Sequence, residues 1–411
     1  MRRGARYRWV VLAVATFTQA ASGFFVQGIG AMGIQLQREL GLSTAQLGLL
    51  VSAAQFVPLV GLLVAGELLD RCDERWVVGA GAGVVAVALG AGALVPGYAG
   101  LLAVLLVVGA GYSTVQPGGS KSVASWFHAS QRGFAMGVRQ AGLPLGAAFA
   151  SAVLPLVAGA FGWRAALVTG GFVALLGAVA FMTLYRRPPG RAVLPRARTP
   201  RGVRMRLLRE PAMVRTMLAG AGLISVQCGV GILTVLYLHE VAHAGAGAAA
   251  LVLVATQGTG VLGRIALAAW SDRVGVGRQR AVVVCMVAVV AGMAVLLTPA
   301  GRSAAVACCA FLWLGFFGFG WYGPWVAQVT ESAPPDRTGF ALGLAMSVNQ
   351  IAIVAVPPLL GLLKDLSGGF APAWGLLIAM TLAALVASVR TGGARRSADP
   401  APDRDEVACP S

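Results

Sequence analysis

Long apolar segments separated by short polar ones run along the whole chain. Windows of about 20 mostly apolar residues, the length that a helix needs to cross the hydrocarbon core of a bilayer, occur twelve times. The predicted spans are 9–34, 45–68, 76–95, 99–122, 133–158, 165–185, 214–238, 249–269, 281–298, 304–328, 339–363 and 373–389. The pattern therefore predicts an all-α membrane protein with twelve transmembrane helices.

Composition and charge agree with a membrane protein. Hydrophobic residues make up 57% of the 411 positions, which is more apolar surface than one soluble core can bury. The net charge of +17 could indicate nucleic-acid binding, but the cations form short clusters between apolar runs, so we expect no nucleic-acid partner. By the positive-inside rule, these clusters place both termini in the cytoplasm of a protein that crosses the cell membrane many times.

The longest polar connection divides the spans into six and six. It carries nine arginines and five prolines between Arg186 and Pro211, which suits a solvated linker along an anionic cytoplasmic surface. The sequence thus predicts an N-terminal six-helix bundle (1–185), a cytoplasmic Arg/Pro-rich linker (186–212), a C-terminal six-helix bundle (213–391) and a disordered cytoplasmic tail (392–411).

The two halves contain related motifs. An Asp-Arg pair follows span two at Asp70 and span eight at Asp272, 202 residues later. "RGFAMG" around Gly133 is answered by "RTGFALG" around Gly339, 206 residues later. Two matches at nearly the same offset indicate an internal duplication.

With these motifs, essentially the whole chain resembles the major facilitator superfamily. The superfamily's glycine, Asp-Arg pair and basic cluster after span two are matched by Gly66, Asp70, Arg71 and Arg75, although residues 72–74 depart from the usual pattern. The resemblance implies two pseudo-symmetric six-helix bundles that move a small solute by alternating access. The stretches "SWFHASQRGFAMGVRQAGLPLG" and "GLLKDLSGG" resemble the branch that carries organic and inorganic anions.

The Asp-Arg motifs predict gates. An aspartate at a helix end can pair with an arginine and with the N-terminus of a neighbouring helix, and such a latch must open when the two halves move. The alternative is that these residues only set the topology of the loops. The predicted gating residues are Gly66, Asp70, Arg71, Arg75, Asp272 and Arg273.

Charges inside the predicted spans point to the substrate. An ionisable side chain in the membrane costs about 2.5–3.5 kcal/mol on insertion scales. No acidic residue lies in the middle of a span, and we assign two cations to spans, Lys121 and Arg139. Either cation could instead extend to the lipid headgroups. If both face a central cavity, an anionic substrate would balance them.

Polar and aromatic residues of several spans are predicted to line that cavity. Amide side chains would orient the substrate, and two aromatic residues beside a Gly-Pro break in span ten could form part of the wall, although aromatic packing explains them as well. The predicted substrate contacts are Lys121, Arg139, Gln116, Gln140, Gln257, Asn349, Gln350, Trp321 and Tyr322.

These observations predict a secondary active transporter of a small organic anion, a carboxylate, coupled to protons or to a counter-anion. Two alternatives stay open: a proton-coupled exporter of hydrophobic or cationic compounds, and a non-transporting sensor built on a permease fold. We expect no enzyme or metal site, because no Ser/His/Asp constellation, metal-ligand cluster or pair of carboxylates can be assembled from residues that would share a pocket. We expect no cofactor, because the runs "GAGAG" and "GGSKS" lack the soluble βαβ context or the glycine of a nucleotide-binding loop.

Overall fold

The computed structural model describes residues 2–42, 44–188, 209–273, 277–334 and 337–390. The helices of the first half are α1 (Arg2–Gly28), η1 (Ile29–Met32), α2 (Gly33–Leu40), α3 (Thr44–Phe56), α4 (Pro58–Arg71), α5 (Glu74–Gly92), α6 (Gly97–Tyr112), α7 (Val115–Trp126), α8 (Ala129–Phe161) and α9 (Trp163–Leu184). Those of the second half are α11 (Pro211–Glu240), α12 (Ala246–Arg273), α13 (Arg278–Leu297), η2 (Pro299–Arg302), α14 (Ala304–Gly320), α15 (Tyr322–Ser332), α16 (Thr338–Ser367) and α17 (Ala371–Arg390).

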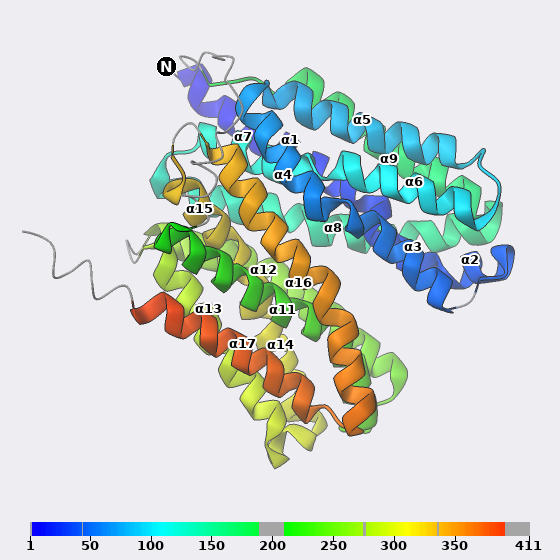
Figure 1. Ribbon diagram of the computed structural model, residues 1–411, viewed down its shortest axis with the longest axis vertical. Helices are drawn as coiled ribbons and strands as arrows, with labels where there is room; N and C mark the ends of the chain where they lie inside the picture. Colours follow the sequence, from blue (N-terminus) through cyan, green and yellow to red (C-terminus); the bar gives the residue numbers. More distant parts are fainter. Residues whose placement is uncertain (1, 43, 189–208, 274–276, 335–336, 391–411) are drawn as a thin grey trace, which may run out of the picture.

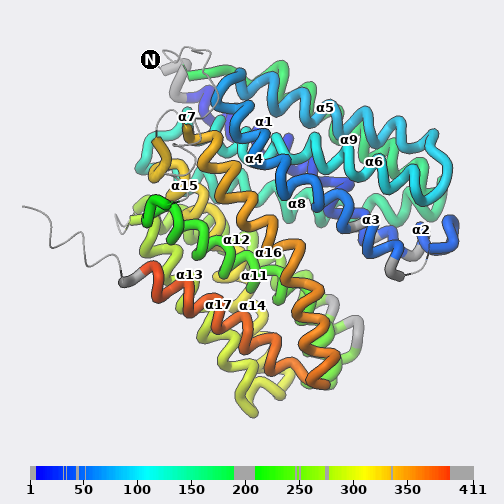
Figure 2. Tube along the Cα trace, in the orientation of Figure 1, coloured from blue at the N-terminus to red at the C-terminus, as the bar shows by residue number. Residues whose placement is uncertain are grey.

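Within the described residues, twelve helical segments are long and apolar enough to cross a membrane, which confirms the predicted all-α fold with twelve spans. The predicted bundles correspond to α1–α9 and α11–α17 (Figures 1 and 2). Most of the predicted linker (189–208) and the whole of the predicted tail lie outside the described residues.

Three spans consist of two helices in succession: α3 with α4, α6 with α7, and α14 with α15. In each case a proline lies in the first turn of the second helix, at Pro58, Pro117 and Pro324. Because proline has no backbone N–H and clashes with the preceding turn, the helix is interrupted there. These interruptions matter for function, since residues beside them line the cavity described below.

The two halves meet near the end of the molecule where α1 begins and α17 ends, which we call the terminal end. In Figure 1 the ribbons lie together around α7 and α15 and diverge toward α2 and the far ends of α14 and α16. Across the junction α4 packs on α16 and α8 packs on α12. A Cβ on Gly66 of α4 would lie 2.5 Å from the carbonyl oxygen of Gly339, so the absence of a side chain permits this approach.

The buried apolar residues repeat this arrangement. One cluster joins both halves and includes Leu62, Met136 and Phe340. A second cluster, around Leu105 and Trp163, belongs to the first half alone. The halves thus share a core on one side and keep separate packing on the other, as expected for bundles that move relative to each other.

Candidate functional site

A cavity of about 180 Å³ lies between the two halves, lined by residues from both of them. Most of its polar lining consists of amide side chains. These are Gln27, Gln55, Gln116, Gln140, Gln227, Asn349 and Gln350. The hydroxyl-bearing Tyr112, Ser113 and Tyr322 contribute further polar groups to the lining. A small polar solute could be held here by many hydrogen bonds.

Arg264 of α12 brings a positive charge to this lining. The side chain is 3% exposed, and its Nη1 donates to the carbonyl oxygen of Gln140, on α8 of the other half, at 2.6 Å. The guanidinium carbon lies 5.9 Å from the ring centroid of Tyr322, within cation–π range. Its Nε has no hydrogen-bond partner.

No aspartate, glutamate or second cation is among the described residues that line the cavity. Arg264 is missing from the contacts predicted above, and the assignment of only two intramembrane cations is wrong. The signal was present, because an arginine inside the predicted span 249–269 is as costly as Lys121 or Arg139.

Arg139 of α8 lies directly behind the lining. It is fully buried, and its Nη2 donates to the side-chain oxygen of Gln19 at 2.8 Å and to the carbonyl oxygens of Val115 and Gln116 at 3.0 and 2.8 Å. Its Nε and Nη1 have no hydrogen-bond partner. Arg139 therefore joins α1, α7 and α8 and supports Gln116, which does line the cavity.

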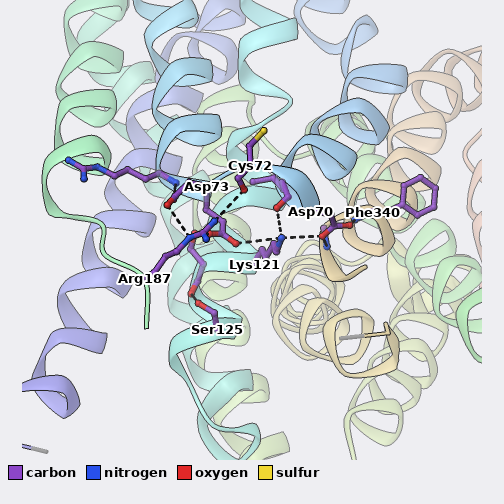
Figure 3. Close-up of polar contacts among 12 residues, drawn as sticks. Asp70, Cys72, Asp73, Lys121, Ser125, Arg187 and Phe340 are labelled. Atoms are coloured by element: carbon purple, nitrogen blue, oxygen red, sulfur yellow. Dashed lines mark hydrogen bonds and ion pairs between the residues drawn. The ribbon is translucent and has the colours of Figure 1, made fainter. Parts of the chain in front are cut away.

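Lys121 lies away from the cavity, at the terminal end. Its Nζ is 3.1 Å from Asp70 and 3.5 Å from Glu74, and it also donates to the carbonyl oxygen of Leu69 (Figure 3). The expectation that Lys121 faces the cavity without a protein carboxylate is therefore wrong. Because α7 continues only to Trp126, Lys121 lies close to the helix end, beside the end of α4.

The other predicted contacts divide in two. Five of them line the cavity, namely Gln116, Gln140, Tyr322, Asn349 and Gln350. Gln257 and Trp321 do not belong to the lining, and Trp321 is instead fully buried, with its ring centroid 5.4 Å from that of Trp325. Trp321 is therefore explained by aromatic packing rather than by contact with the cavity.

Two aspartates connect the halves at the terminal end. Asp70 accepts hydrogen bonds from the backbone N–H groups of Gly339 and Phe340, at 2.9 and 2.8 Å, in the first turn of α16 (Figure 3). We call the contacts of Asp70 the first latch and those of Asp272 the second latch. Asp272, in the second latch, accepts from Gly133 and Phe134 at 3.1 and 2.6 Å, near the start of α8. Asp70 thus lies at the positive end of α16, and Asp272 binds backbone N–H groups one turn into α8, each in the opposite half.

The sequence also matches a known protein family. The family model described as Major Facilitator Superfamily matches residues 12–357. The chain belongs to the Major Facilitator Superfamily. The predicted resemblance is therefore confirmed.

Two relatives are similar to this chain over different shares of its length. An uncharacterized MFS-type transporter of Mycobacterium tuberculosis is 29% identical over 383 residues, which cover 93% of this chain and 85% of the relative. The hexuronate transporter of Escherichia coli K12 is 28% identical over 188 residues, or 46% of this chain and 44% of that protein. Among solved structures, the MFS proton:xylose symporter XylE superposes with a TM-score of 0.77 at 16% sequence identity. The match covers 93% of this chain and 95% of the XylE chain.

The cation in the first latch differs from the one predicted from the superfamily motif. Arg71 pairs with Glu67 at 3.2 Å, and Arg75 donates from Nε to the carbonyl oxygen of Met182, so neither makes an ion pair with Asp70. Lys121, from α7, does so instead. An arginine is the partner expected for Asp70, and the structure has a lysine in its place, whereas the expected contact with the N-terminus of a neighbouring helix is present.

The second latch of this superfamily member has an arginine that the sequence pattern did not single out. Arg278, at the start of α13, pairs with Asp272 and also donates to the carbonyl oxygen of Ala129 in the other half. Its Nη1 is 2.8 Å from the hydroxyl of Ser271. Its position six residues after Asp272 could have indicated it, since Arg75 follows Asp70 by five.

The first described residues of the linker contact the first latch. Arg187 lies 3.1 Å from Asp73 and 3.1 Å from Glu74, the same glutamate that pairs with Lys121 (Figure 3). Glu74 is therefore shared between the latch and the start of the connection to the second half. Among the described residues, no group of histidine, cysteine, aspartate or glutamate side chains is placed to hold a metal ion.

Proposed function

We propose that this protein is a secondary transporter that moves a small organic anion by alternating access, with Arg264 binding the anionic group. The observation that carries the proposal is the position of Arg264 in an inter-half cavity whose described lining contains no carboxylate. A buried guanidinium without a counter-ion is costly. A substrate carboxylate would supply the missing charge through paired hydrogen bonds to the guanidinium.

The alternating-access part of the proposal is supported by the arrangement of the two halves. The latches join the halves at the terminal end, and the ribbons diverge toward the opposite end (Figure 1). Rocking of one half against the other would break these contacts and expose the cavity to the terminal side. By the positive-inside rule, we propose that the terminal end is cytoplasmic and that the membrane is the cell membrane.

Coupling would involve a proton carried on the substrate or exchange against a second anion. The described lining has no aspartate, glutamate or histidine to carry a transported proton. The hexuronate transporter named above, similar over part of its length, supports an anionic substrate. A cationic substrate is disfavoured because Arg264 would repel a cation.

Uptake by the purified protein in liposomes tests the proposal. Radiolabelled glucuronate, lactate and succinate serve as probes, and Arg264→Gln is compared with Lys364→Gln. Lys364 pairs with Glu240 at 2.6 Å outside the cavity lining, so its variant loses the same charge elsewhere. We expect saturable uptake of at least one anion, reduced at least tenfold in Arg264→Gln and retained in Lys364→Gln. Undiminished uptake in Arg264→Gln would refute the assignment.

A further inference from the structure

The amide groups of the cavity contain buried polar atoms that no protein group satisfies. Both the nitrogen and the oxygen of Asn349 lack a hydrogen-bond partner, and the same holds for the Nε2 of Gln140 and the Oε1 of Gln227. All three residues line the cavity. A buried amide atom without a partner loses the hydrogen bond that it makes to water, so a ligand whose polar groups reach these atoms gains hydrogen bonds that the protein alone does not make.

These atoms include both donors and acceptors. The side-chain nitrogens of Asn349 and Gln140 donate, and the oxygens of Asn349 and Gln227 accept. Exchange of the oxygen and nitrogen positions of Asn349 leaves the conclusion unchanged, because both of its atoms lack partners. A hydroxyl group donates and accepts, and it satisfies such a mixed set where a hydrocarbon chain satisfies none of it.

The positive charge at the lining limits the number of carboxylates. Arg264 contributes the one cation of the described lining, and its Nε still lacks a partner. Arg139 lies behind the lining with its Nη2 bound to Gln19 and to two carbonyl oxygens. The site therefore offers one place for a carboxylate and several for hydroxyl groups.

We infer that the transported anion is a polyhydroxylated monocarboxylate, an acid of the sugar-acid type. Its carboxylate binds Arg264, and its hydroxyl groups bind the amides of Asn349, Gln140 and Gln227. This inference rests on the proposed function, since it specifies which organic anion occupies the same cavity. A site built around hydroxyl hydrogen bonds rejects an analogue that lacks them far more strongly than an apolar pocket rejects an added group.

Binding of matched ligands to the purified wild-type protein tests the inference. Calorimetry compares gluconate with hexanoate, which share chain length and charge but differ in hydroxyl groups, and with the neutral sorbitol and the dianionic succinate. We expect gluconate to bind at least tenfold more tightly than each of the other three. Hexanoate or succinate binding as tightly as gluconate would overturn the inference and leave anion binding at Arg264 intact. Sorbitol binding as tightly as gluconate, or the failure of every carboxylate to bind folded protein, would overturn the proposed function as well.

Removal of one amide gives a second test. Asn349→Leu is compared with Gln328→Leu, which removes an amide from α15 outside the cavity lining, where Gln328 donates to Thr216 at 3.1 Å. We expect Asn349→Leu to weaken gluconate binding at least tenfold with hexanoate binding unchanged or stronger, whereas Gln328→Leu keeps the wild-type preference. Equal weakening of both ligands in Asn349→Leu would count against the inference. If Asn349→Leu fails to fold, Gln227→Leu is measured with the same expectation.

Discussion

At the scale of single residues, three cations within apolar segments have three different sets of partners. Arg264 lines the cavity and bonds to a carbonyl oxygen of the other half. Arg139 supports the lining from behind, and Lys121 holds the carboxylates of Asp70 and Glu74. All three lie in apolar segments of the sequence, although only Lys121 and Arg139 were among the predicted substrate contacts, and their different partners give them different roles.

Lys121→Met is expected to lower stability. The Asp70 side chain is 1% exposed and that of Lys121 is 19% exposed, so the substitution leaves a buried carboxylate without its cation. Breaking a buried pair costs about 3–5 kcal/mol, and the partial exposure of Lys121 reduces this to about 2 kcal/mol. Thermal unfolding in detergent should show a clearly lower Tm, with Lys121→Arg close to wild type. A variant that keeps the wild-type Tm but no longer binds the anion would instead place Lys121 in the binding site.

At the scale of elements, the halves touch where glycines permit helix backbones to approach. Gly66 of α4 meets Gly339 and Gly343 of α16, in the same turns that present Asp70 to the start of α16. Latch geometry and close packing therefore depend on each other. The same span is interrupted between α3 and α4 at Pro58, which lines the cavity.

Gly66→Ala should destabilise the closed terminal end. The added methyl group would lie 2.5 Å from the carbonyl oxygen of Gly339, which is backbone and cannot move without separating α4 from α16. Gly83→Ala is the matched control, since a Cβ at Gly83 in the transmembrane helix α5 has no atom within 4 Å. We expect a lower Tm for Gly66→Ala and an unchanged or higher Tm for Gly83→Ala. Equal Tm values for the two variants would contradict this packing argument.

At the scale of the whole molecule, two latches related by the internal repeat hold the terminal end. They are not equivalent, because Asp70 is paired with a lysine of its own half from α7, whereas the arginine paired with Asp272 also bonds across to the first half. Opening therefore requires the loss of both carboxylate-to-helix contacts, of the Arg278 bridge and of the ion pair between Arg132 and Glu331, which lie 3.5 Å apart across the halves. Substrate bound at Arg264 would act close to this junction, since Arg264 already contacts Gln140 of the other half.

Neutralising both aspartates should open the terminal end. Spin labels replace the exposed Trp76 and Arg280, one in each half, in protein whose native cysteines are substituted. Asp70→Asn and Asp272→Asn each weaken charge-assisted hydrogen bonds to backbone N–H groups of a helix in the opposite half, so longer label-to-label distances should gain population, most of all in the double variant. Pulsed electron–electron double resonance measures the distribution of label-to-label distances. An identical distribution in wild type and double variant would show that the latches do not control opening.

The sequence by itself determined the twelve spans, the superfamily and the two Asp motifs, because hydropathy over a span and the spacing of motifs are properties of local sequence. It also identified five of the residues that line the cavity. Only the tertiary structure decided that Lys121 pairs with Asp70, that Arg139 lies behind Gln116, and that Arg264 faces the cavity. The partner of a charge in an apolar helix depends on how that helix is rotated and which helix lies opposite it. Both are set by packing between residues that are far apart in the sequence.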